Sequence, residues 1–163
     1  MMSNAFLILG GNLGDRFDYL NRAKAAIEGS LGIIVQASSL YETEPWGFEH
    51  DQFFLNQVIK LETALQPAEL LRLCKEIEIS LGRKRGEERY SARTIDIDIL
   101  LYNDLVLATP ELTIPHPRMA NRRFVLEPLA EIAPLLKHPL SQKTMNQLLA
   151  ECDDTCEVTR LTV

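Results

Sequence analysis

Several features are scarce in this chain of 163 residues, and each scarcity excludes a class of protein. Only three cysteines are present, Cys74, Cys152 and Cys156, too few for a disulfide framework, which favours a reducing, cytoplasmic location. No apolar run approaches the roughly 18 residues that a membrane span requires. Because the first apolar stretch is short and follows no basic residues, we expect a first strand there and not a signal peptide.

Basic charge is also in short supply. The chain has 17 Lys and Arg against 23 Asp and Glu, which gives a net charge of -6. A protein this acidic is a poor non-specific partner for nucleic acid, so we expect neither nucleic acid nor membrane as a partner. Local concentration of arginine in an acidic protein predicts a site for a small anion. Eight of the 17 basic residues fall between positions 83 and 123: Arg83, Lys84, Arg85, Arg89, Arg93, Arg118, Arg122 and Arg123.

The order of the expected elements predicts an α+β fold in a single domain over residues 1–163. Apolar alternation and turn residues predict strands at residues 4–9, 33–41, 53–62, 94–102 and 105–107, and helices after Asp15, after Pro67 and near residues 121–129 and 145–151. The βαββαβ order is that of a ferredoxin-like sandwich with C-terminal additions, whose antiparallel sheet carries helices on one face. We expect the other face to remain free for a site, and residues 42–52 to form a loop.

The most informative segment is Thr94-Ile95-Asp96-Ile97-Asp98-Ile99. Side chains alternate across a strand, so the three isoleucines point to one face and the two aspartates to the other, with Cβ atoms about 7 Å apart. Two like charges on one face repel unless a cation lies between them. Hard oxygen ligands without neighbouring cysteine suit Mg²⁺ completed by substrate phosphates. A solvated strand face is the competing interpretation of the same pattern.

The loop after residue 82 favours the metal interpretation. Residues 83–93 carry five cations and two anions beside the aspartate pair. Carboxylates that hold Mg²⁺, together with arginines that fork onto phosphate oxygens, are the composition of a nucleoside triphosphate site. Closure of such a loop over phosphates would exclude water. An ordinary charged surface loop is the alternative.

Aromatic and amide side chains gather in a second region. Trp46 and Phe48 lie in the expected loop, and Phe54 and Asn56 share a face of the next strand because they are two residues apart. Rings and an amide together are able to hold a flat heteroaromatic group by stacking and hydrogen bonding. Taken by themselves, such residues more often anchor a loop or pack in a core, and they do not predict a ring site.

These motifs together resemble the 6-hydroxymethyl-7,8-dihydropterin pyrophosphokinase family. The resemblance rests on Arg93-Thr94-Ile95-Asp96-Ile97-Asp98, Ile114-Pro115-His116 and Asn121-Arg122-Arg123-Phe124, with Gly10-Gly11-Asn12-Leu13-Gly14 and Phe54-Leu55-Asn56 nearer the start. It covers about residues 4–140. It implies a ferredoxin-like fold and transfer of diphosphate from ATP to the hydroxymethyl oxygen of 6-hydroxymethyl-7,8-dihydropterin, with AMP released, in folate biosynthesis.

The resemblance also implies a role for each matching residue. Two Mg²⁺ ions would bind Asp96 and Asp98, and Arg83 and Arg93 would assist catalysis. The ATP contacts would be Glu78, Arg83, Arg85, Arg93, Ile99, Thr113, His116 and Arg122. The pterin would stack between Phe54 and Phe124 and contact Thr43, Pro45, Trp46, Asn56 and Tyr90. Tyr90 stands where some members have Trp, and no general base is evident. We expect the protein to act as a monomer on ATP and the pterin.

Two other functions fit part of the pattern. A different metal-dependent phosphoryl or nucleotidyl transferase would use the same aspartates on another acceptor, and its products would differ from AMP and a pterin diphosphate. A ferredoxin-like ligand-binding or RNA-binding module would turn over no ATP, although acidic charge and the lack of an RNP-type aromatic motif oppose RNA.

Overall fold

The computed structural model describes residues 1–44, 52–82 and 94–162. Within them, the first hundred residues give the order β1, α1, β2, β3, β4, α2 and β5, and shorter elements follow. The strands are β1 (Ser3–Gly11), β2 (Ile33–Ala37), β3 (Tyr41–Thr43), β4 (Phe54–Thr63), β5 (Asp96–Tyr102), β6 (Leu107–Ala108), β7 (Thr113–Ile114) and β8 (Val158–Arg160), and the helices are α1 (Arg16–Ser30), α2 (Pro67–Ser80), α3 (Arg123–Ile132) and α4 (Met145–Glu151).

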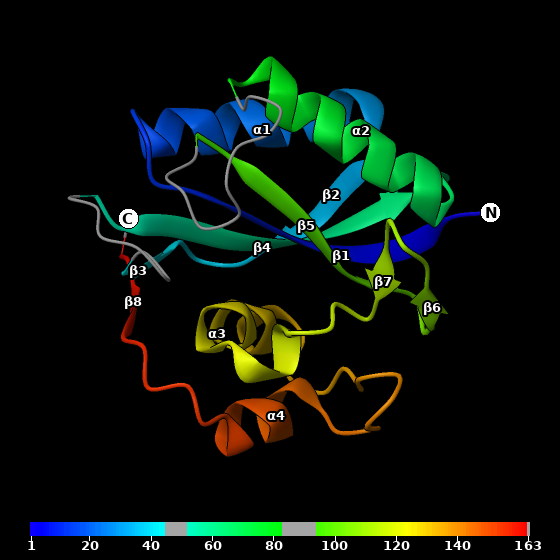
Figure 1. Cartoon of the computed structure of the whole chain (residues 1–163), viewed down its shortest axis with the longest axis vertical. Coiled ribbons are helices and arrows are strands. Elements are labelled where there is room, and N and C mark those ends of the chain that lie inside the picture. The colour runs from blue at the N-terminus through cyan, green and yellow to red at the C-terminus, as the bar shows by residue number, and fades with distance from the viewer. Residues whose placement is uncertain (45–51, 83–93, 163) are drawn as a thin grey trace.

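The predicted fold class is confirmed by the sheet topology. The main sheet has the order β5-β1-β4-β3-β8, β2 also pairs with β4, and the paired strands are antiparallel. Since β2 and β3 together fill the place of one strand, the first hundred residues form a βαββαβ unit of ferredoxin-like order. Helices α1 and α2 cover one face of the sheet, and α3 and α4 lie on the other side (Figure 1). The sequence pattern does not predict β8, which extends the sheet beside β3.

The two covering helices begin and pack as their sequences predict. The side chain of Asp15 accepts a hydrogen bond from the backbone N–H of Asp18 at 3.0 Å and caps α1. Pro67 occupies the first turn of α2, where its missing N–H leaves no helix bond unmade. Buried Ile27 of α1 and Leu70 of α2 lie in one core with the inward side chains of β1, β4 and β5.

The second face of the sheet is not free over its whole length, and that expectation is wrong. A separate core of Phe6, Ile8 and Val58 from the sheet and Leu126 and Leu129 from α3 fills part of it. An irregularity in the pairing of β1 with β5 contributes, because it turns two successive leucines, Leu100 and Leu101, toward this core. Helix α3 covers this apolar surface, which would otherwise face water. The row of Gly10, Asn56 and Asp96 described below lies on this face beyond these apolar side chains.

Two expected boundaries also change. Glu42 and Thr43 belong to β3 and pair with β4, so the loop expected at residues 42–52 begins after them. The short strand expected at residues 105–107 begins instead at Leu107, and it pairs with β7. Pairing with β7 anchors the segment that leads to His116, as described below.

Gly32, between α1 and β2, is required by close backbone contact. A Cβ added there would lie 2.1 Å from the carbonyl oxygen of Glu62 on β4. We expect Gly32→Ala to destabilise the fold by about 1–3 kcal/mol, since the backbone of one element must shift. Gly29→Ala, in α1 with no neighbour within 4 Å of the added atom, should instead be neutral or stabilise by about 0.5–1 kcal/mol. Urea unfolding of both variants measures the difference, and equal stabilities would contradict it.

Candidate active site

Strand β5 separates its isoleucines from its aspartates as the alternation predicts. Ile95, Ile97 and Ile99 are 1%, 3% and 3% exposed and lie in the core beneath α1 and α2. Asp96 and Asp98 have intermediate exposure, and Asp98 pairs with Ile8, a residue of the core on the α3 side. Residues paired across antiparallel strands point to the same face. Both aspartates therefore lie on the face toward α3.

Strand register brings a second predicted residue onto this face. Gly10 of β1 pairs with Asp96 on one side and with Asn56 of β4 on the other. Asn56, Gly10 and Asp96 thus form one row across three adjacent strands. Neighbouring strands lie about 4.8 Å apart, so the backbones of Asn56 and Asp96 are roughly 10 Å apart. The residues predicted to bind pterin and metal therefore stand on one surface, with a glycine between them.

The pterin-side residues are held together by β3. The Nδ2 atom of Asn56 donates to the Oγ1 atom of Thr43 at 3.1 Å, and these residues are 5% and 4% exposed. Thr43 pairs with Phe54, which shares the Asn56 face of β4. The structure therefore places the three predicted residues side by side on one face, with Thr43 and Asn56 buried, Phe54 partly exposed, and the carboxamide of Asn56 held through its Nδ2 atom.

Glu78 contacts the aspartate strand from α2. Its Oε2 atom accepts a hydrogen bond from the backbone N–H of Ile97 at 2.7 Å. Ile97 stands between Asp96 and Asp98 in the sequence, and Glu78 itself is 4% exposed. Nearby, burial raises the pKa of the Cys74 thiol to about 12, and the negative charges of Glu78 and Asp98 add to this effect. The predicted ATP contact of Glu78 stays a prediction, and the described contact is structural.

The residues predicted at the nucleotide side run along the outer edge of β5. The backbone N–H of His116 donates to the carbonyl oxygen of Leu100 at 2.9 Å. The Nδ1 atom of His116 accepts from the backbone N–H of Arg118 at 3.2 Å, which leaves Nε2 to carry the proton of a neutral ring. Thr113 is exposed on β7. Ile99, by contrast, has its side chain in the core, so an ATP contact there falls to its main chain.

Two further predicted residues meet at the start of α3. The guanidinium carbon of Arg122 lies 5.6 Å from the ring centroid of Phe124, within range of a cation–π interaction. Phe124 packs at the border of the α3-side core with intermediate exposure. The structure therefore places an aromatic ring and a cation together on the same side of the sheet as the aspartates.

Six of the predicted site residues lie outside the described part of the chain. They are Pro45 and Trp46 of the aromatic loop and Arg83, Arg85, Tyr90 and Arg93 of the basic loop. Both segments lie close in sequence to described site residues. One residue separates Thr43 from the first segment, and two residues separate Asp96 from the second.

The aspartate pair offers hard oxygen ligands for a divalent cation. Within residues 1–44, 52–82 and 94–162, no three His, Cys, Asp or Glu side chains are grouped to hold a metal. Mg²⁺ commonly takes one or two carboxylates and completes its shell with water and substrate phosphates. The donor set of Asp96 and Asp98 fits that mode of binding. Across the same described ranges, no helix combines the length and apolarity needed to cross a membrane.

One cluster at this end of the sheet is not evident from the sequence pattern. Asn12 is fully buried just after β1, and its Nδ2 atom donates to the carbonyl oxygen of Gln52 at 3.3 Å. Arg16 donates through Nη1 to a carboxylate oxygen of Glu42 at 2.7 Å and to the carbonyl oxygen of Phe53 at 3.0 Å. These contacts hold the turn after Gly10 against the start of β4.

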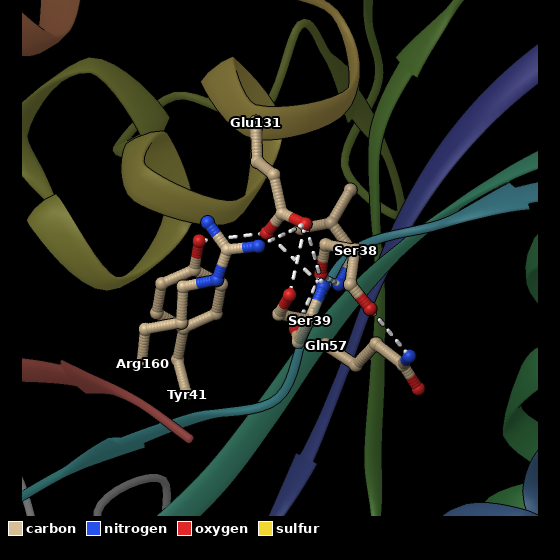
Figure 2. A network of polar contacts seen from close by, with 7 residues as sticks. Ser38, Ser39, Tyr41, Gln57, Glu131 and Arg160 are labelled. Atoms are coloured by element: carbon tan, nitrogen blue, oxygen red, sulfur yellow. Dashed lines mark hydrogen bonds and ion pairs between the residues drawn. The ribbon is translucent and has the colours of Figure 1, made fainter. Parts of the chain in front are cut away.

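A second unpredicted group centres on Glu131 of α3 (Figure 2). Its carboxylate accepts hydrogen bonds from the backbone N–H of Ser39 at 3.0 Å, from the hydroxyl of Ser39 at 2.9 Å and from the hydroxyl of Tyr41 at 2.7 Å. Arg160 of β8 adds a longer ion pair at 3.4 Å. Because Tyr41 pairs with Asn56, this group fixes β3 beside the predicted pterin residues.

The hydrogen bonds of this group change the acidity of both partners. Burial raises the pKa of the Tyr41 hydroxyl, and its hydrogen bond to Glu131 raises it further. Burial alone would raise the pKa of the Glu131 carboxyl, but hydrogen bonds from Tyr41 and Ser39 outweigh this effect and lower it. The pair therefore remains a neutral phenol bonded to a carboxylate over the ordinary pH range.

Comparison with known proteins places these residues in context. Residues 6–134 match a family model described as 7,8-dihydro-6-hydroxymethylpterin-pyrophosphokinase (HPPK). The chain is 47% identical over 133 residues to the 2-amino-4-hydroxy-6-hydroxymethyldihydropteridine pyrophosphokinase of Bacillus subtilis, covering 81% of this chain and 79% of that protein. It is 42% identical over 150 residues to the protein of the same name from Aquifex aeolicus, covering 92% of each.

Solved structures agree at the level of the fold. The crystal structure of Plasmodium falciparum HPPK-DHPS with pteroate superposes with a TM-score of 0.76 at 19% sequence identity. The match covers 93% of this chain but 42% of that one. This chain therefore spans less than half the length of that structure.

Proposed function

The chain belongs to the 7,8-dihydro-6-hydroxymethylpterin-pyrophosphokinase family, and from this premise we propose that the row Asn56–Gly10–Asp96 is the floor of its active site. The enzyme transfers diphosphate from ATP to the hydroxymethyl group of 6-hydroxymethyl-7,8-dihydropterin, in folate biosynthesis. The observation that carries the proposal is the strand register, which sets Asn56 and Asp96 on one face on either side of Gly10.

The reaction needs the hydroxymethyl group of the pterin and the triphosphate of ATP bound next to each other. The hydroxymethyl oxygen attacks the β-phosphorus of ATP, the bond from that phosphorus to the α–β bridging oxygen breaks, and AMP leaves with the bridging oxygen. The hydroxyl proton is released. Since covalent help from protein is not required, positioning of the two substrates and neutralisation of phosphate charge account for the catalysis.

Asp96 and Asp98 are the residues that would hold two Mg²⁺ ions in this proposal. Bound there, the ions would supply neutralisation of the triphosphate charge and polarisation of its oxygens. The aspartates fit this role because they share a face and lie at the edge strand of the sheet. Glu78 would keep that strand in place through its bond to Ile97.

The other residues divide between the two substrates. Arg83, Arg85, Arg93, Glu78, Ile99, Thr113, His116 and Arg122 would line the nucleotide, with Arg83 and Arg93 acting in catalysis. Phe54 and Phe124 would stack on the pterin, and Thr43, Pro45, Trp46, Asn56 and Tyr90 would surround it. In support, Asn56 and Thr43 form one buried hydrogen-bonded pair, whereas His116 follows the outer edge of β5.

The proposal is tested by incubating the protein with Mg-ATP and 6-hydroxymethyl-7,8-dihydropterin and following AMP and pterin diphosphate together. Equal rates of formation support it. ADP or inorganic diphosphate as the product would point to a different phosphoryl or nucleotidyl transferase. Lack of ATP turnover would point to a binding module. A parallel reaction without Mg²⁺ tests the metal requirement and should give no product.

Asn56→Ala should raise KM for the pterin while leaving KM for ATP unchanged. Loss of a buried hydrogen-bonding group costs about 1–3 kcal/mol, which corresponds to roughly 5- to 150-fold in KM. Steady-state kinetics with each substrate varied in turn measures both constants. Asn146→Ala, on the exposed side of α4, is the matched control. A pterin KM within twofold of the parent value would contradict a binding role for Asn56.

Location and assembly are part of the same proposal. We propose a cytoplasmic enzyme that acts as a monomer and binds neither nucleic acid nor membrane, in line with its acidic charge and unpaired cysteines. Light scattering during size-exclusion chromatography tests whether the protein is a monomer, because a dimer would have twice the 18.5 kDa mass of the chain.

A further inference from the structure

Resting on the proposed function, we infer that Gly10 is a positioning residue for the pterin: its missing side chain leaves the space that the carboxamide of Asn56 occupies. Gly10 touches neither substrate in this proposal. It acts through Asn56, and its replacement should weaken binding of the pterin and not of ATP.

The geometry at Gly10 is unusually close. A Cβ added to Gly10 would lie 2.3 Å from the Oδ1 atom of Asn56 and 3.2 Å from the carbonyl oxygen of Leu55. Real Cβ atoms essentially never approach a heavy atom within 3.0 Å. The carboxamide of Asn56 therefore lies directly over the backbone of Gly10, and even a methyl group would displace it.

Asn56 has little freedom to move aside. Its Nδ2 atom donates to Thr43 at 3.1 Å, so the carboxamide is held from the β3 side. The residue is 5% exposed, and Tyr41, its partner on β3, is tied to Glu131 of α3. Displacement of the carboxamide by a methyl group at position 10 must therefore break the bond to Thr43 or turn the Oδ1 atom away from its place.

The place of Gly10 in the register makes the effect selective. The glycine lies between Asn56 and Asp96, and it carries no side chain that could contribute to the metal side. Backbone pairing of β1 with β5 does not depend on a Cβ atom. Gly10→Ala should thus disturb the Asn56 side of the row and leave the aspartate side in place.

Steady-state kinetics of Gly10→Ala tests this inference. We expect KM for 6-hydroxymethyl-7,8-dihydropterin to rise about tenfold or more, with KM for ATP changed less than twofold. Gly29→Ala is the matched control, since the same methyl group added there meets nothing within 4 Å. It should leave both constants unchanged. An unchanged pterin KM in Gly10→Ala, or an equal rise in both KM values, would overturn the inference.

A double variant separates this effect from general damage. In an Asn56→Ala background the obstructed carboxamide is absent, so adding Gly10→Ala should raise the pterin KM less than twofold further. If Gly10→Ala alone fails to fold, the inference is still supported when the double variant folds and has the same kinetic constants as Asn56→Ala. Failure of the double variant to fold would overturn it, because the obstruction would then not be Asn56.

The same set of variants distinguishes this inference from the proposed function. If Asn56→Ala leaves the pterin KM unchanged, the proposed pterin role of Asn56 is wrong. If Asn56→Ala raises it and Gly10→Ala does not, only the role of Gly10 is wrong.

Discussion

Asp98→Asn is expected to lower kcat for AMP formation by at least about a thousandfold. A metal ion that stabilises developing phosphate charge contributes several kcal/mol, and about 4 kcal/mol corresponds to a factor of 10³. Asparagine keeps the size of the side chain and removes its charge, so the fall in kcat measures the contribution of cation binding. Asp98 pairs with Ile8 in the strand register, so its carboxylate lies on the face toward α3, where the substrates are proposed to bind.

A second measurement ties this loss to Mg²⁺. In Asp96→Asn and Asp98→Asn, the Mg²⁺ concentration needed for half-maximal activity should rise well above that of the parent enzyme. Asp104→Asn is the control, because Asp104 is exposed in the turn two residues after β5. It should keep the parent activity and Mg²⁺ dependence. Near-parental turnover in both site variants at limiting Mg²⁺ would exclude a metal role for the pair.

Glu131→Ala is expected to produce the largest loss of stability of the changes considered, about 3 kcal/mol. The substitution leaves the Ser39 N–H and the Tyr41 hydroxyl without their acceptor, and hydrogen bonds to a charged group contribute about 1.5–3 kcal/mol each. At roughly 2–4 °C per kcal/mol for a chain of this size, Tm should fall by about 6–12 °C. Calorimetry or urea unfolding measures the change.

Glu127→Ala, one turn earlier on the same helix, is the matched control. Glu127 forms an ion pair with Arg123 at 3.4 Å, and its side chain is one-third exposed. Its loss should cost less than about 0.5 kcal/mol. Similar stabilities for the two variants would show that the bonds between α3 and β3 contribute little.

The pH dependence of stability follows from the direction of the Glu131 shift. Its pKa is lower in the folded state than the ordinary value of 4.5. The stabilisation is therefore fully present above the unfolded pKa and is lost as pH falls through the folded pKa. As the pH falls below the ordinary value of 4.5, the stability of Glu131→Gln should decline less than that of the parent protein. An identical acid profile in the two proteins would contradict the shift.

Much of the candidate site is already determined by local sequence. The two-residue period of a strand requires Asp96 and Asp98 to share a face opposite Ile95 and Ile97, whatever surrounds them. The same period joins Phe54 to Asn56. Capping by Asp15 and the start of α2 at Pro67 are likewise local, because the bonds involved lie within one turn. Turn residues and apolar spacing then give the βαββαβ order.

What only the tertiary structure decides is which of these segments meet and in what register. The pairing of Gly10 with both Asn56 and Asp96 joins residues more than forty positions apart, and a shift of one residue would have turned Asn56 to the other face. The cover of α3 over part of the sheet and its anchoring by Glu131 depend on long-range contacts in the same way. Backbone geometry sets the alternation of side chains within a strand, whereas packing of the whole chain sets the strand register and the position of α3 over the sheet. The row of Asn56, Gly10 and Asp96, which unites the two halves of the site, therefore exists only in the folded protein.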